Sequence, residues 1–200
     1  MLAYLFWHRP QTDSPAEEYE DALKGFHSSL AHQRPVGLRD SCSFRVSELP
    51  WLPAAGPEGS APLGGYEDWY LLDDYASLGI LNEAAVGRGH RTAHDHAARR
   101  FGAGTAGLFA LEEGEAAALR PSSVAVWVAR EPGSAEPALG ELLGDGTSAG
   151  ASCLWRRQLV LGPAPEFCLL AQEVPAGVSE SRLPSGWSAR TLAREALPEG

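Results

Sequence analysis

The chain is short of basic residues and of long apolar stretches. Lysine and arginine together number 16 against 26 aspartates and glutamates, and the formal net charge is −10. Because nucleic-acid binding requires a basic face that neutralises phosphates, this balance argues against a nucleic-acid partner. The apolar N-terminal run, residues 1–7, is too short for a signal peptide or a membrane span, and His8, Arg9 and Pro10 end it. We therefore expect a cytoplasmic protein with no membrane partner.

Cysteine is also scarce. The three cysteines, Cys42, Cys153 and Cys168, are odd in number, and each lies in an apolar run. No CxxC pair and no cysteine–histidine spacing typical of a metal site occurs. We predict buried free thiols and no cofactor. Lys24 is the only lysine, which together with abundant alanine, glycine and proline indicates a GC-rich bacterial genome.

What the chain does contain is an internal similarity. Residues 41–45 (SCSFR) and 152–156 (SCLWR) share the pattern Ser-Cys-x-aromatic-Arg, 111 positions apart. Two further pairs of blocks recur in the same order: 3–10 with 125–132, and 68–72 with 166–170. The matched order predicts one structural unit used twice, the second copy being the shorter. With 200 residues, each copy is the size of a small domain.

The first copy reads as β-α-β-β-α-β. Apolar or alternating runs predict strands at 2–8, 41–49, 66–72 and 105–111. Apolar residues at helical spacing predict one helix capped by Asp13 or Ser14, and a second running from Asp73 or Asp74 to about Val86. Within the strand at 41–49, alternation places Arg45 on the face opposite Phe44.

The second copy is degenerate. We expect strands at 124–129, 152–161 and 166–171, a short helix at 135–143, and a loop at 174–185. Residues 187–197 fit either a closing strand or a helix. Residues 1–113 and 123–200 are thus the predicted repeats, with 114–122 as linker.

This element order resembles the dimeric α+β barrel (ferredoxin-like) superfamily, fused here into a single chain. The resemblance covers nearly the whole sequence, but no signature matches one member family, among them antibiotic-biosynthesis-type monooxygenases and YciI-like proteins. It implies an α+β fold in which two ferredoxin-like sheets pack into one barrel with the helices outside. It also implies a pocket in or near that barrel. We expect a monomer or a homodimer, because fusion supplies the second sheet internally.

Two arginines are the strongest candidates for ligand binding. If Phe44 and Trp155 pack under the helices, then Arg45 and Arg156 point into the barrel, where two guanidinium groups could bind a carboxylate. The alternative is that each pairs with a local acid such as Glu48, Asp68 or Glu166.

His8 is the candidate catalytic residue, since a histidine on the first strand can act as a general base near neutral pH. A purely structural histidine is the alternative. Tyr70 and Trp7 are candidate walls of an aromatic ligand pocket, although aromatics of this kind also serve as core.

A cluster of histidines gives a weaker metal hypothesis. His90 and His94 share a helical face, whereas His96 points away from it, and neither HExxH nor a two-histidine, one-carboxylate pattern is present. We expect a solvated helix and no metal site.

Two functional hypotheses stay open. The first is a small-molecule-binding barrel, with or without cofactor-independent catalysis of the monooxygenase or YciI-like kind, acting on an aromatic or acidic metabolite. The second is a non-catalytic scaffold or interaction protein that keeps the duplicated fold.

Overall fold

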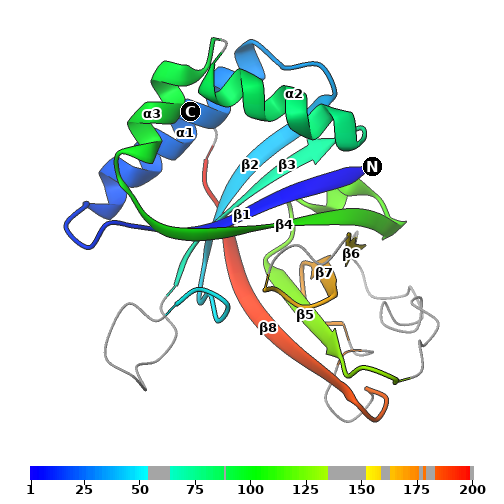
Figure 1. Cartoon of the computed structure of the whole chain (residues 1–200). Helices are drawn as coiled ribbons and strands as arrows, with labels where there is room; N and C mark the ends of the chain where they lie inside the picture. Colours follow the sequence, from blue (N-terminus) through cyan, green and yellow to red (C-terminus); the bar gives the residue numbers. More distant parts are fainter. Residues whose placement is uncertain are drawn as a thin grey trace.

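The computed structural model describes residues 1–53, 64–87, 89–134, 152–158, 163–175, 178 and 183–198. In this part of the chain, eight strands and three α-helices form a mixed α+β structure (Figure 1). All the strand pairs are antiparallel. The predicted α+β class is confirmed. No helix in the described part has the length and apolar character needed to cross a membrane.

The elements follow one another along the chain with a 3-10 turn, η1 (Ala116–Ala118), near the middle. The strands are β1 (Leu2–Pro10), β2 (Leu38–Val46), β3 (Gly65–Leu72), β4 (Phe101–Gly114), β5 (Val124–Arg130), β6 (Cys153–Arg157), β7 (Phe167–Ala171) and β8 (Trp187–Ala196). The helices are α1 (Ala16–His32), α2 (Tyr75–Val86) and α3 (Arg91–Ala98).

Hydrogen bonds link the strands in the closed order β1-β3-β2-β8-β5-β7-β6-β4. The three helices all lie on the outer side of β1, β2, β3 and β4, in the upper part of Figure 1. The strands of the second half, β5 to β8, complete the cycle below them. Each strand in the first half therefore has one face toward the barrel interior and one toward the helices.

The two helices expected in the first copy form as α1 and α2, but only α2 is capped as predicted. Asp74 caps α2, its carboxylate accepting hydrogen bonds from the Ser77 amide at 2.9 Å and the Ser77 hydroxyl at 2.7 Å. The cap of α1 was predicted wrongly: Pro15 holds the cap position, and no side chain bonds to the first turn. A proline with its fixed φ starts this helix without a polar cap.

The closing segment is a strand, β8, which decides between the two predictions for residues 187–197. The backbone of β8 forms hydrogen bonds to both β2 and β5. These bonds outweigh the helix propensity of its alanine residues. The predicted helix at 135–143 lies outside the described residues, as do parts of the predicted loop at 174–185 and of residues 50–65, which connect the strands predicted at 41–49 and 66–72. The repeat boundaries stay a prediction.

The barrel interior is filled by large side chains. Trp7, Trp69, Trp127 and Trp155 are all buried, and edge-on contacts join Trp69 to Trp155 at 5.6 Å and Trp7 to Trp127 at 5.5 Å between ring centroids. The three cysteines share this core as free thiols, as predicted. An eight-stranded barrel has an interior just wide enough for its side chains, so packing of this kind leaves the interior solid.

The predicted side-chain directions in the two matched segments, 41–45 and 152–156, were therefore wrong. Phe44 and Trp155 point into the barrel, and Arg45 and Arg156 point outward. Large aromatic rings fill a closed interior well, whereas a guanidinium group is stabilised by carboxylates near solvent. The inversion follows from closure of the sheet, which alternation alone does not reveal.

One ion pair is nevertheless enclosed in the barrel. Arg194 on β8 and Glu67 on β3 are fully buried, with 3.0 Å between Nη2 and Oε1. The Arg194 guanidinium lies 3.5 Å from the centre of the Phe44 ring, and the Trp69 indole donates to Glu67 at 3.0 Å. This arrangement balances two charges inside an aromatic core.

Candidate functional site

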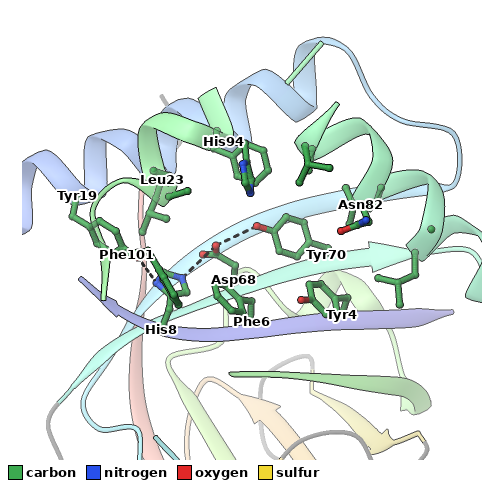
Figure 2. Close-up of a pocket in the computed structure, with 18 of the residues that line it drawn as sticks. Tyr4, Phe6, His8, Tyr19, Leu23, Asp68, Tyr70, Asn82, His94 and Phe101 are labelled. Carbon is green, nitrogen blue, oxygen red and sulfur yellow. Dashed lines mark hydrogen bonds and ion pairs between the residues drawn. The ribbon is translucent and has the colours of Figure 1, made fainter. Parts of the chain in front are cut away.

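A cavity of about 630 Å³ lies between the outer face of the sheet and the helices (Figure 2). Strands β1 and β3 form its floor, α1, α2 and α3 its roof, and the start of β4 one end. Its volume is in the range of small-molecule sites. Small residues on the facing helices leave this space, because Gly79, Ala85, Ala97 and Ala98 do not reach the sheet.

The floor carries a buried carboxylate. Asp68 on β3 is 3% exposed and lies beside His8 on β1, with 3.3 Å between His8 Nε2 and Asp68 Oδ2. On its other side His27 of α1 approaches, with 3.4 Å between His27 Nε2 and Asp68 Oδ1. The Tyr70 hydroxyl donates to Oδ2 at 3.2 Å. Asp68 is thus enclosed by two imidazoles and a phenol, as the dashed lines in Figure 2 show in part.

These neighbours set the charge state of Asp68. Burial by itself would raise the pKa of the carboxyl, but the positive potential and hydrogen bonding of His8 and His27 outweigh burial and lower that pKa below its ordinary value. Burial and the nearby Asp68 charge in turn raise the pKa of the Tyr19 and Tyr70 hydroxyls. Asp68 is therefore an anion at neutral pH, and the phenols around it are protonated.

His8 is held in one orientation by its surroundings. The Tyr19 hydroxyl is 2.7 Å from His8 Nδ1, while Nε2 faces Asp68. Phe6 and Tyr66 stack on the imidazole with ring centroids at 5.0 and 5.8 Å. The exposed fraction of His8 is 0%. Both ring nitrogens therefore face protein groups, and two aromatic rings stack on the imidazole.

The rest of the cavity wall is apolar and uncharged. Aromatic rings dominate the floor, and aliphatic side chains and short residues dominate the roof. Asn82, Tyr75 and His94 add polar groups on the helix side, and the lining residues that the structure describes include no lysine or arginine. Among these residues a ligand meets one carboxylate, several phenols and no permanent cation.

Of the residues predicted for catalysis or ligand binding, the structure places His8 and Tyr70 at this cavity; His94, a weak candidate metal ligand, lines it as well. Trp7 alternates to the opposite face of β1 and packs in the barrel core. Arg45 bonds to Glu20 on α1 at 2.6 Å and to Glu195 at 2.7 Å, outside the cavity. The two arginines do not converge on one ligand, so the prediction that they do was wrong.

Arg156 lies in the other half of the barrel. Its guanidinium contacts Glu166 at 3.0 Å and lies 5.4 Å from the centre of the Phe167 ring. For Arg156 the structure contains the alternative that the sequence suggested, an ion pair with the nearby Glu166. Arg45 also forms ion pairs, but with Glu20 and Glu195 and with none of the acids named from the sequence.

The candidate metal ligands have separate partners. His90 Nδ1 lies 2.7 Å from the Ser29 hydroxyl, whereas His94 packs edge-on against Phe26 and faces Asp95 at 3.3 Å. In the ranges that the structure describes, no three histidine, cysteine, aspartate or glutamate side chains are arranged to hold a metal ion.

Sequence reasoning missed Asp68, Tyr19 and His27. The sequence suggests Asp68 only as an ion-pair partner for an arginine, and Tyr19 falls among the apolar residues that predict the first helix. A usable signal existed: two consecutive acids, Glu67 and Asp68, interrupt an otherwise aromatic and aliphatic strand. His27 sits one residue beyond Phe26 on the buried side of α1, and only the tertiary contact shows its role.

Comparisons with known proteins add a fold but no activity. No protein-family model and no curated protein matches the chain. An anthrone oxidase-like protein of known structure is similar over 100% of this chain and 93% of its own, with 12% identity and a TM-score of 0.51. A dimeric ferredoxin-like protein of unknown function from Bacteroides fragilis NCTC 9343 covers 54% of this chain and 92% of its own, with 11% identity and a TM-score of 0.36. At such identities the likeness concerns the fold alone.

Proposed function

We propose that this chain is a duplicated, single-chain α+β barrel whose cavity binds a neutral, largely aromatic small molecule and catalyses proton transfer from it. Strand order supports the duplication: β4-β1-β3-β2 in the first half recurs as β8-β5-β7-β6 in the second. Only the first half carries helices over its outer face among the described residues, so the ligand site is present once.

The observation that carries the proposal is a buried acid–base group at the floor of an aromatic cavity. Asp68, His8 and Tyr19 are joined by contacts of 3.3 and 2.7 Å in a cavity of about 630 Å³. Buried ionisable side chains of this kind are unfavourable for folding unless paired, and they are common at functional sites. A structural core position in the same sheet would have been filled by an apolar side chain at lower cost.

The charges of the wall select the ligand class. An anionic ligand would meet the Asp68 carboxylate and no lysine or arginine in the lining. A neutral ligand with aromatic rings instead packs on Phe6, Tyr4 and Phe101 and can donate a hydrogen bond to the floor. Of the two metabolite classes expected from the sequence, we therefore favour the aromatic one over the acidic one.

Proton abstraction is the chemistry that such a floor supports. A histidine oriented by a carboxylate accepts a proton, and the carboxylate stabilises the imidazolium that forms. The structural neighbour described as anthrone oxidase-like suggests a suitable probe. Anthrone is a neutral three-ring ketone whose central methylene hydrogens are acidic, so its proton exchange with solvent can be followed without any oxidant.

The test has a binding arm and a chemical arm. Calorimetric titration is expected to show saturable binding of anthrone at one site per chain, at least about tenfold tighter than anthracene carboxylate, an anionic analogue of similar size. Proton NMR in deuterated buffer is expected to show methylene exchange accelerated by about 10²-fold or more, and loss of the acceleration in His8→Gln. Binding of neither probe, or preference for the carboxylate, contradicts the proposal; binding without accelerated exchange reduces it to a binding protein.

A further inference from the structure

The proposed proton transfer has a geometric difficulty at His8. The imidazole is 0% exposed, its Nε2 faces Asp68, and its Nδ1 faces the Tyr19 hydroxyl. The Phe6 and Tyr66 rings stack on it. A ligand in the cavity therefore has no route to a free nitrogen of His8. Some other group must contact the ligand and pass the proton to the imidazole.

The tautomer of His8 shows which group this is. Asp68 is ionised and can only accept, so the ring hydrogen of a neutral His8 belongs on Nε2, facing the carboxylate. Nδ1 then carries the lone pair and accepts the Tyr19 O–H at 2.7 Å. With its hydrogen committed to His8, the Tyr19 oxygen has lone pairs left to accept a hydrogen bond from a ligand.

Tyr19 also has the required position. It lines the cavity from α1. Figure 2 shows it at one end of the cavity, joined to His8 by a dashed line, with Tyr70 on the opposite side of Asp68. Tyr70 also lines the cavity, but its hydroxyl donates to Asp68, whose lowered pKa makes this carboxylate a weaker proton acceptor than an imidazole.

We propose that Tyr19 is the catalytic residue that contacts the ligand, and that it passes the ligand proton to His8 in a Tyr19–His8–Asp68 relay. This inference rests on the proposed function of the cavity. The ligand C–H or O–H bond breaks, its electron pair stays on the ligand as an enolate or phenolate, and the proton bonds to the Tyr19 oxygen. In the same step the Tyr19 O–H proton moves to His8 Nδ1. The ligand gains one negative charge and His8 one positive charge, which Asp68 stabilises. The protons on Tyr19 and His8 then exchange with water that enters the open cavity, and reversal delivers a solvent hydrogen to the ligand.

The surroundings favour a relay over a stored phenolate. Burial and the Asp68 charge raise the pKa of Tyr19, so a free phenolate is not a stable resting state. Concerted transfer avoids that state, because the Tyr19 oxygen gains one proton as it loses another. His27 supplies a second imidazole beside Asp68, with 3.4 Å between His27 Nε2 and Asp68 Oδ1.

Three variants test the relay with the anthrone exchange assay. Tyr19→Phe keeps the ring and removes the hydroxyl, and we expect exchange to fall about 10²-fold or more, to the level of His8→Gln, with anthrone affinity within about threefold of wild type. Tyr70→Phe removes the hydroxyl that bonds to Asp68 from the other side, and its rate of anthrone exchange is expected to stay within about tenfold of the wild-type rate. Groups that act as one unit are not additive, so Tyr19→Phe combined with His8→Gln should be no slower than either alone.

The outcomes separate this inference from the proposed function. If wild type binds no anthrone or exchanges no faster than buffer, the proposed function fails first. If the wild-type protein and the Tyr19→Phe variant both accelerate anthrone exchange and the His8→Gln variant does not, the relay through Tyr19 is wrong. If Tyr70→Phe lowers the rate of anthrone exchange more than Tyr19→Phe does, the proton passes through Asp68, and the relay through Tyr19 is again wrong. Unfolding curves show whether each variant is folded. If the double variant is not folded, the single variants are sufficient to test the relay.

Discussion

Glu67 and Asp68 are consecutive acids on β3, and they lie in opposite environments. Glu67 points into the barrel, where Arg194 neutralises it and aromatic rings fill the surroundings. Asp68 points toward the helices, where His8, His27 and Tyr70 surround it at the edge of an open cavity. One acid is paired with a permanent cation and the other with groups that exchange protons.

The difference follows from how each face is closed. The interior of an eight-stranded barrel is bounded by strands on all sides, so its side chains interdigitate and leave no room for a ligand. The outer face is covered by helices whose small residues stop short of the sheet, which leaves space above Asp68. In this barrel the interior provides stability, and the layer between sheet and helices provides the site.

The largest expected effect concerns the interior pair. Arg194→Met leaves Glu67 buried without its cation, which should lower the free energy of unfolding by about 3–5 kcal/mol in urea denaturation. Combining it with Glu67→Gln, which keeps an acceptor for the Trp69 indole, should restore part of that loss. If the double variant is as unstable as the single one, the charge pairing is not what stabilises this part of the core.

Asp68 should make stability depend on acid pH. Its folded pKa is depressed below the unfolded value of about 3.9, so its contribution is fully present above that value and is lost as pH falls toward the folded pKa. Each unit of depression corresponds to about 1.4 kcal/mol. Urea midpoints between pH 6 and pH 2 should therefore fall more steeply in wild type than in Asp68→Asn. Parallel curves for the two proteins would show that the carboxylate is not stabilised by its neighbours.

Filling the cavity should separate binding from folding. A side chain at Gly79 of α2 would meet open space at the cavity wall, whereas one at Gly25 of α1 meets open space outside the lining. Gly79→Leu and Gly25→Leu should both gain up to about 1 kcal/mol from helix propensity. Only Gly79→Leu should weaken anthrone binding, by about tenfold in calorimetric titration. Equal affinities in the two variants would place the ligand elsewhere.

The smallest effect is expected at the outer arginine. Arg45 has a 47% exposed side chain and pairs with Glu20 and Glu195, so Arg45→Met should cost less than about 1 kcal/mol. Anthrone affinity should not change, because Arg45 lies outside the cavity lining. Urea denaturation and calorimetric titration of this variant check both statements. A large loss of anthrone affinity would show that Arg45 contributes to the ligand site.

The sequence predicted local structure well where one signal dominated. Alternation and apolar runs located β1, β2, β3 and β7 to within a few residues, and the Asp74 cap marked the start of α2. Composition predicted buried free cysteines. His8 and Tyr70, which strand position and aromatic character single out as candidates, both line the cavity, and their role in a ligand site stays a prediction. All these features depend on residues close together in the chain.

The sequence by itself determined which residues share a strand face; tertiary structure decided which face is inside. Period-two alternation separates Phe44 from Arg45 and Glu67 from Asp68, but both assignments of the faces satisfy it equally. Closure of the sheet resolves the choice, because an enclosed interior selects bulky rings and one neutralised charge pair. The site likewise depends on α1 bringing Tyr19 and His27 to residues about 40 to 50 positions further along the chain, on β3, and to His8 on β1. Such long-range contacts arise from packing of elements and leave no local pattern in the sequence.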